Sequence, residues 1–171
     1  MVYPIVKYGQ LVLEEKAQTI TEFDTAELHK LIEDMFESMY AARGVGLAAP
    51  QIGVGKRLAV IDVTTGEDPT QKVVLINPEI VAREGAQTGE EGCLSLPTFR
   101  EPVTRAQKVT VKAWDAKGVA FEMTGEDLMA RALQHETDHL NGTLYISHIS
   151  PLKRDLIRRK VRKLQKAGEW G

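Results

Sequence analysis

The sequence predicts an α+β fold in which largely antiparallel sheets pack with three helices. One helical pattern lies near the N-terminus, several short runs rich in β-forming residues follow, and two further helical patterns end the chain. Strands that follow one another without intervening helices pair antiparallel, and helices segregated from the strands are typical of the α+β class. The 171 residues contain no internal repeat and no linker-like tract, so we expect one domain over residues 1–171.

The first helix is expected over residues 24–43. Asp24 and Glu27 have the spacing of an N-cap and its capping-box partner, and Gly44 is suited to the stop. Apolar residues recur there at helical spacing and predict one buried stripe: Leu28, Leu31, Ile32, Met35 and Met39.

Strands are expected where β-forming residues cluster between turn signals. These segments are residues 58–63, 73–76, 80–81, 108–114 and 119–123. Residues 44–55 are rich in glycine and predict an irregular segment, and the segment around residues 90–97 is predicted as turns between strands.

Two helices are expected after the strands. One runs over about residues 125–141, with Thr124 and Asp127 as a capping box and Gly142 as the stop. The other begins at Ser150-Pro151 and ends near Gly168. This last helix is strongly basic and carries Lys153, Arg154, Arg158, Arg159, Lys160, Arg162 and Lys163.

Composition argues against several function classes. A net charge of −2 gives no broad basic field for nucleic acid, and no apolar run is long enough to span a membrane. The first residues lack the basic start and long apolar core of a secretory signal. The single cysteine, Cys93, excludes an intrachain disulfide.

The second of the three helices carries His135-Glu136-Thr137-Asp138-His139, which matches the pattern H-E-x-x-H. Histidines four residues apart lie on one helix face and can reach one metal ion, while Glu136 can reach a bound water. The alternative is a pair of polar residues on an exposed helix face. His29 and His148 fall in no such pattern and are expected to be ordinary surface residues.

A catalytic metal needs at least one more protein ligand, and Cys93 is the only thiol available. One thiolate and two imidazoles leave a coordination position open for water. An open position of this kind distinguishes a catalytic metal site from a structural one. The alternative for Cys93 alone is a small buried apolar residue.

Three segments together resemble the motifs of the peptide deformylase family. The family patterns G-x-G-L-A-A-x-Q, E-G-C-L-S and Q-H-E-x-D-H-L are all matched, in the family's order, by residues 44–51, 91–95 and 134–140. The likeness extends over nearly the whole chain, and the basic terminal helix resembles the bacterial subtype. It implies antiparallel sheets packed around a central metal-binding helix, with one helix from each end of the chain.

The resemblance implies a hydrolase that removes the formyl group from the N-terminal formyl-methionine of new polypeptides. It implies that Cys93, His135 and His139 bind one divalent metal ion, natively often Fe(II), with zinc, nickel or cobalt able to occupy such sites. Glu136 is expected to be the general base for water. The side-chain amide of Gln51 and the backbone N–H of Leu94 are expected to stabilise the developing oxyanion.

The resemblance also implies a methionine pocket and a close approach of the substrate backbone. Val45 and Gly46 are expected beside that backbone, and Leu128, with Leu94 and Val45, is expected to line the pocket. Arg131 and Ala132 stand where many members have apolar or small residues in that pocket.

Several alternatives stay open. Glu91 and Asp138 are both candidates to orient a histidine, and either could pair with Arg100 or Arg105. The basic helix is either a solvated face or a docking surface for the ribosome. The rival functions are a zinc endopeptidase and an inactive, metal-stabilised binding module. The family resemblance places the chain in a bacterial cytoplasm.

Overall fold

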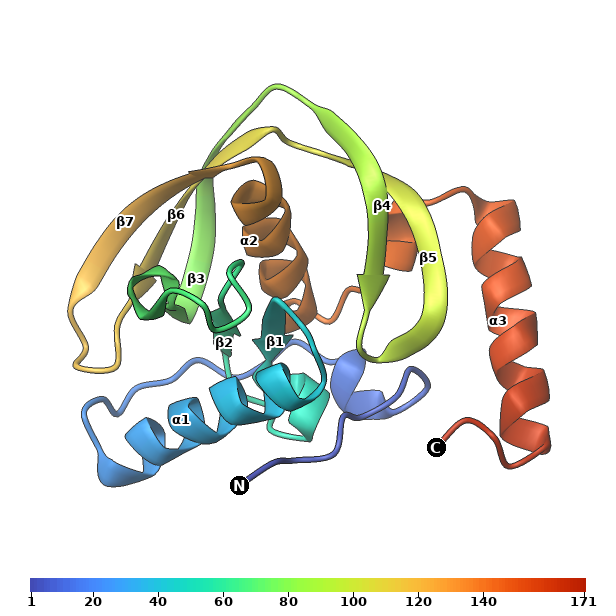
Figure 1. Ribbon diagram of the computed structural model, residues 1–171, viewed down its shortest axis with the longest axis horizontal. Helices are drawn as coiled ribbons and strands as arrows, with labels where there is room; N and C mark the ends of the chain where they lie inside the picture. The colour runs from blue at the N-terminus through green and yellow to red at the C-terminus, as the bar shows by residue number, and fades with distance from the viewer.

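A computed structural model describes residues 1–171 and places helix α2 between two antiparallel sheets (Figure 1). The three helices are α1 (Ala26–Ala41), α2 (Asp127–Leu140) and α3 (Pro151–Lys166). The strands are β1 (Gly46–Ala48), β2 (Leu58–Ile61), β3 (Val73–Glu84), β4 (Gln87–Cys93), β5 (Leu96–Arg105), β6 (Lys108–Trp114) and β7 (Ala120–Glu126). Short 3-10 turns are η1 (Leu11–Leu13), η2 (Ala49–Ile52), η3 (Pro69–Gln71) and η4 (Tyr145–His148). The α+β class is confirmed.

The larger sheet has the order β1-β2-β3-β6-β7, and every neighbouring pair is antiparallel. Residues 73–76 and 80–81, expected as two runs, belong to the single strand β3. The register of β3 against β6 shifts between Ile76 and Glu79, where Asn77 has φ 50° and Pro78 has no N–H to donate. This bulge explains why the sequence pattern looks interrupted there.

The hairpin of β4 and β5 forms the second sheet, and it corrects the expectation of turns over residues 90–97. Only the tight connection after Cys93 is a turn. The strand β4 has the sequence Gln-Thr-Gly-Glu-Glu-Gly-Cys, in which Thr88 is the one β-branched residue and no aromatic residue signals a strand. Its pairing with β5 is therefore a tertiary effect that local sequence does not reveal.

The start of α1 differs from the expected capping box. Thr25 is the N-cap, and its hydroxyl accepts a hydrogen bond of 3.1 Å from the backbone N–H of Leu28. Asp24 has φ 55° and its carboxylate instead pairs with His29 at 2.6 Å. The expected stripe is buried except at Leu31, which is half-buried, and it packs against β1 and β2.

The start of α2 also differs from expectation. Thr124 lies inside β7, and the helix begins at Asp127 after Glu126, whose side chain makes no capping bond. Strand β7 therefore runs directly into the helix, which turns back across the larger sheet (Figure 1). Ala130, Leu133 and Leu140 bury one side of α2 against this sheet, so its other side faces the hairpin.

Helix α3 lies on the outer side of the hairpin, beside β5 (Figure 1). It begins as expected, with the Ser150 hydroxyl accepting from the N–H of Lys153 at 3.2 Å. Ile157, Val161 and the terminal Trp170 bury its inner face in a cluster with residues of β5 and η4. None of the three helices combines the length and hydropathy needed to cross a membrane.

Candidate metal centre

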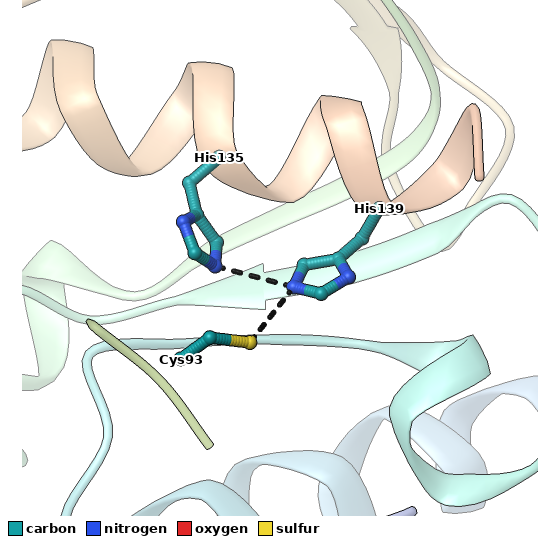
Figure 2. Close-up of side chains that lie close together, drawn as sticks. All are labelled: Cys93, His135 and His139. Atoms are coloured by element: carbon teal, nitrogen blue, oxygen red, sulfur yellow. Dashed lines mark hydrogen bonds between the residues drawn. The ribbon is translucent and has the colours of Figure 1, made fainter. Parts of the chain in front are cut away.

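Three side chains with metal-binding atoms meet between the hairpin and α2 (Figure 2). Helix α2 presents His135 and His139 one turn apart, and their Nε2 atoms are 3.2 Å apart. Cys93, at the end of β4, places its Sγ 3.3 Å from Nε2 of His139. The three candidate ligand atoms all lie within 4.8 Å of one another. The structure thus brings together the three residues predicted as ligands.

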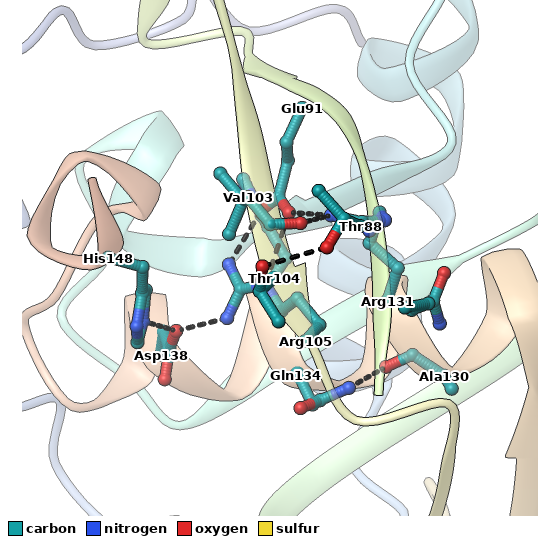
Figure 3. A network of polar contacts seen from close by, with 12 residues as sticks. Thr88, Glu91, Val103, Thr104, Arg105, Ala130, Arg131, Gln134, Asp138 and His148 are labelled. Carbon is teal, nitrogen blue, oxygen red and sulfur yellow. Dashed lines mark hydrogen bonds and ion pairs between the residues drawn. The ribbon is translucent and has the colours of Figure 1, made fainter. Parts of the chain in front are cut away.

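Glu91 fixes the orientation of His135. Its Oε1 lies 2.5 Å from Nδ1 of His135, so this nitrogen donates to the carboxylate and Nε2 is the nitrogen turned toward the cluster. Two arginines hold the carboxylate: Nε and Nη2 of Arg105 donate to it at 3.1 and 2.6 Å, and Nη1 of Arg131 donates at 2.7 Å (Figure 3). Of the two carboxylates left open by the sequence, Glu91 is the one that contacts a histidine ligand.

The network continues from Arg105 toward the surface. Asp138 accepts a hydrogen bond of 2.7 Å from Nη1 of Arg105, and its Oδ2 lies 2.9 Å from Nε2 of His148 (Figure 3). His148 was expected to be an ordinary surface residue, and its side chain is 39% exposed but bound to Asp138. Arg100 is not part of the network and pairs with Glu90 at 3.6 Å.

Burial and charge shift the pKa values of this cluster in opposite directions. Burial disfavours the charged form of Glu91, but His135 and Arg105 outweigh it and lower the pKa of this carboxyl. Burial likewise disfavours protonated His135, yet Glu136, Cys93 and Glu91 together raise its pKa well above the usual value. Burial lowers the pKa of His139, so this imidazole is neutral and its lone pair is available.

Glu136, which the sequence predicts as the general base, lies beside the cluster and lines the cavity. It follows His135 on α2, its side chain is buried, and its Oε1 has no hydrogen-bond partner in the protein. Burial raises the pKa of Glu136 to about 7, which suits a group that takes up and returns a proton near neutral pH.

Glu136 leaves no room for a side chain at position 46. A Cβ built on Gly46 would lie 2.9 Å from Cδ of Glu136 and 3.1 Å from its Cγ, and still closer to Oε2. The carboxylate of the predicted base therefore lies directly beside Gly46. The expected approach of a substrate backbone to Gly46 stays a prediction.

We expect Gly46→Ala to displace the carboxylate of Glu136 and to lower kcat by about 10²-fold, because a misplacement of about 1 Å has such effects in active sites. Steady-state release of formate, the product that the sequence resemblance implies, measures the change. Gly55→Ala is the matched control, since a Cβ there meets nothing within 4 Å. Equal kcat values for the two variants would contradict this account of Gly46.

Gln51 is held with its amide nitrogen toward the cluster. Its Oε1 accepts from the backbone N–H of Ala48 at 3.0 Å, and its Nε2 donates to Ser95 Oγ at 3.2 Å and faces Cys93 Sγ at 3.5 Å. The turn η2, which begins with Ala49-Pro50, brings this side chain to the site. Ser95 was not predicted as part of the site, although it belongs to the same motif as Cys93.

A cavity of about 490 Å³ opens beside the cluster. Every residue predicted for the site lines it except His139, which is fully buried behind it. Val45, Gly46 and Gln51 come from the glycine-rich segment, Cys93 and Leu94 from the hairpin, and Leu128, His135 and Glu136 from α2. Leu128 is 47% exposed and stands at the mouth.

The donor set fits a borderline-soft divalent ion. One thiol and two imidazoles are ligands typical of zinc and of other divalent transition metals, and three protein ligands leave a position open on the cavity side. The bond between Glu91 and His135 is the carboxylate–imidazole contact that commonly supports a metal ligand.

Comparison with known sequences gives consistent matches. A family model described as polypeptide deformylase matches residues 2–155. The chain is 61% identical over 170 residues to a peptide deformylase of Acidobacterium capsulatum, covering 99% of both chains. It is 52% identical over 158 residues to one of Thermodesulfovibrio yellowstonii, covering 92% of this chain and 95% of the relative.

Solved structures agree. A peptide deformylase from Legionella pneumophila superposes with a TM-score of 0.89 at 48% identity and covers 98% of both chains. One from Thermus thermophilus superposes with a TM-score of 0.85 at 42% identity, covering 95% of this chain and 94% of the other.

Proposed function

Because this chain belongs to the peptide deformylase family, we propose that Cys93, His135 and His139 hold its metal and that Glu136 moves the proton in its reaction. The enzyme is a metal-dependent hydrolase that removes the formyl group from the N-terminus of new polypeptides. One observation carries the assignment of residues: the buried, unpartnered carboxylate oxygen of Glu136 stands beside the Cys-His-His cluster.

The chain's own groups account for the proton transfers. A bound divalent ion would acidify water at neutral pH and polarise the formyl carbonyl. Glu136 takes a proton from the attacking water, whose oxygen forms a bond with the formyl carbon. The C–N bond then breaks, and Glu136 returns the proton to the departing nitrogen, so that formate and a free amine leave.

Negative charge on the formyl oxygen needs donors that are fixed before the reaction. We assign this role to Nε2 of Gln51, which is oriented by the N–H of Ala48, and to the backbone N–H of Leu94. Val45 and Gly46 on one wall and Leu128 on the opposite wall would hold the formyl-methionine between them.

The test is formate release from a formyl-Met peptide by protein loaded anaerobically with Fe(II), and separately with zinc, nickel or cobalt. We expect turnover with metal, none after chelation, and the highest rate with Fe(II). A higher rate with another ion would overturn Fe(II) as the native metal. Cleavage at internal peptide bonds would support the endopeptidase, and metal binding without formate release would support the inactive module.

We propose that the exposed face of α3 docks on the ribosome, where the substrates emerge, in a bacterial cytoplasm. Deleting α3 would remove Ile157 and Val161 from a buried apolar cluster and so destabilise the protein. Charge reversal on the exposed face of α3 tests docking without this effect. Six cations of α3 are exposed and form no ion pair in the structure, and three of them are chosen for the test: Arg159, Lys160 and Lys163.

We expect reversal of these three charges to glutamate to weaken co-sedimentation with ribosomes at low salt by at least about tenfold, because phosphate contacts dominate such binding. Activity on a free peptide should stay unchanged. The matched control reverses Lys16, Lys56 and Lys117, which are also exposed and unpaired. Equal ribosome binding by the two variants would refute docking through α3.

A further inference from the structure

Arg131 has a buried guanidinium nitrogen that nothing in the protein uses. Its side chain is 9% exposed, and Nη1 donates to Glu91 at 2.7 Å and to the carbonyl of Val103 at 3.1 Å (Figure 3). Nη2 is buried and has no hydrogen-bond partner. Buried donors are rarely left unpaired, so this nitrogen points to a partner that arrives from outside the protein.

The position of Arg131 identifies where that partner binds. Arg131 lines the catalytic cavity and precedes His135 by four residues, so both side chains leave the same face of α2 about 6 Å apart along its axis. On the other side, a Cβ on Gly89 of β4 would lie 3.5 Å from Nη2. The nitrogen therefore lies between α2 and β4, in the side chain of a residue that lines the cavity and stands one helical turn from a predicted metal ligand.

The charges around Arg131 favour a neutral partner. Its guanidinium is already paired with Glu91, and the network balances two arginines, Arg105 and Arg131, against two carboxylates, Glu91 and Asp138. An anionic ligand would therefore meet no uncompensated positive charge there. A weak, neutral acceptor on an otherwise apolar side chain suits the site, and the thioether sulfur of methionine is such an acceptor.

We propose that Nη2 of Arg131 donates a hydrogen bond to the thioether sulfur of the substrate's first residue. Arg131 is then a specificity-determining residue that distinguishes methionine from norleucine, which has the same shape and a methylene in place of sulfur. A purely apolar pocket would favour norleucine, because a methylene is easier to desolvate than a thioether. The inference rests on the proposed function, since it requires formyl-methionine in this cavity.

The test compares kcat/KM for two peptides that differ only in formyl-methionine or formyl-norleucine at the first position. We expect the parent enzyme to favour methionine by about fivefold, which is modest for a guanidinium donor because the thioether sulfur is a weak acceptor. In Arg131→Leu the ratio should fall to one or below, because the pocket is then apolar. A loss of kcat/KM that is common to both substrates cancels in this ratio. The loss of the hydrogen bond from Arg131 to Glu91 would have such a common effect.

Leu128→Ala is the matched control. Leu128 stands at the mouth of the cavity and would contact the methionine and norleucine side chains alike, so this variant should keep the parent's ratio of kcat/KM values. A parent ratio at or below one would overturn the inference without any variant, even if Arg131→Leu does not fold. An unchanged ratio in Arg131→Leu would show that the arginine only braces Glu91. No formate from either peptide would overturn the proposed function itself, which is a separate result.

Discussion

Replacing Glu136 with glutamine is expected to lower kcat for formate release by about 10³-fold while the bound metal is retained. A positioned general acid or base contributes roughly 10²–10⁴-fold to a rate. Glutamine has nearly the same shape as glutamate but cannot take the proton from water or return it to the amine. Its Cys93, His135 and His139 neighbours stay unchanged, so metal content should equal that of the parent.

Glu122→Gln is the control for this variant, because Glu122 is exposed on β7 and its side chain forms no hydrogen bond or ion pair in the structure. Metal content measured beside kcat separates loss of chemistry from loss of the ion. If Glu136→Gln kept its metal and lost less than about threefold in kcat, another group would have to carry the proton.

Replacing Glu91 with glutamine is expected to give the largest loss of stability, about 3–5 kcal/mol in the free energy of unfolding. The change leaves the guanidinium groups of Arg105 and Arg131 buried without their shared anion. Removing one member of a buried ion network typically costs this much, and in a chain of this length it lowers Tm by about 10 °C. Thermal or urea unfolding of the metal-free proteins measures it without interference from metal affinity.

Glu90→Gln is a matched control one residue away. Its carboxylate is 67% exposed and pairs with Arg100 only at 3.6 Å, so it should change stability by less than about 0.5 kcal/mol. Similar losses in the free energy of unfolding in the two variants would mean that the buried network stabilises the fold no more than an exposed ion pair does.

The parts of the site that lie close together in the sequence could be predicted from it. His135, Glu136 and His139 follow from helical spacing, and the structure places all three on α2 as expected. The same holds for α3, whose Ser150-Pro151 start and C-terminal end near Gly168 were predicted closely. In α2 the spacing of residues, and in α3 the capping residues, were enough to predict the local structure.

The partners that meet through tertiary contacts could not be predicted in the same way. The hairpin β4–β5 has a polar, glycine-rich first strand, so its pairing gave no local signal. The pairing of Glu91 with Arg105 and Arg131 depends on that hairpin facing α2, and the sequence left several partners open. The tight fit of Gly46 against Glu136 likewise joins segments about 90 residues apart.

The β4–β5 hairpin is a two-stranded sheet that pairs with no strand of the larger sheet, yet it supplies Cys93 to the cluster. Such a pair of strands has little stability by itself and depends on its packing against η4 and α3 and on the contacts of Glu91 with α2. Regions held this way open more readily than the body of a fold. On heating, catalysis should therefore cease before the main sheet melts, because the hairpin carries one of the three candidate metal ligands.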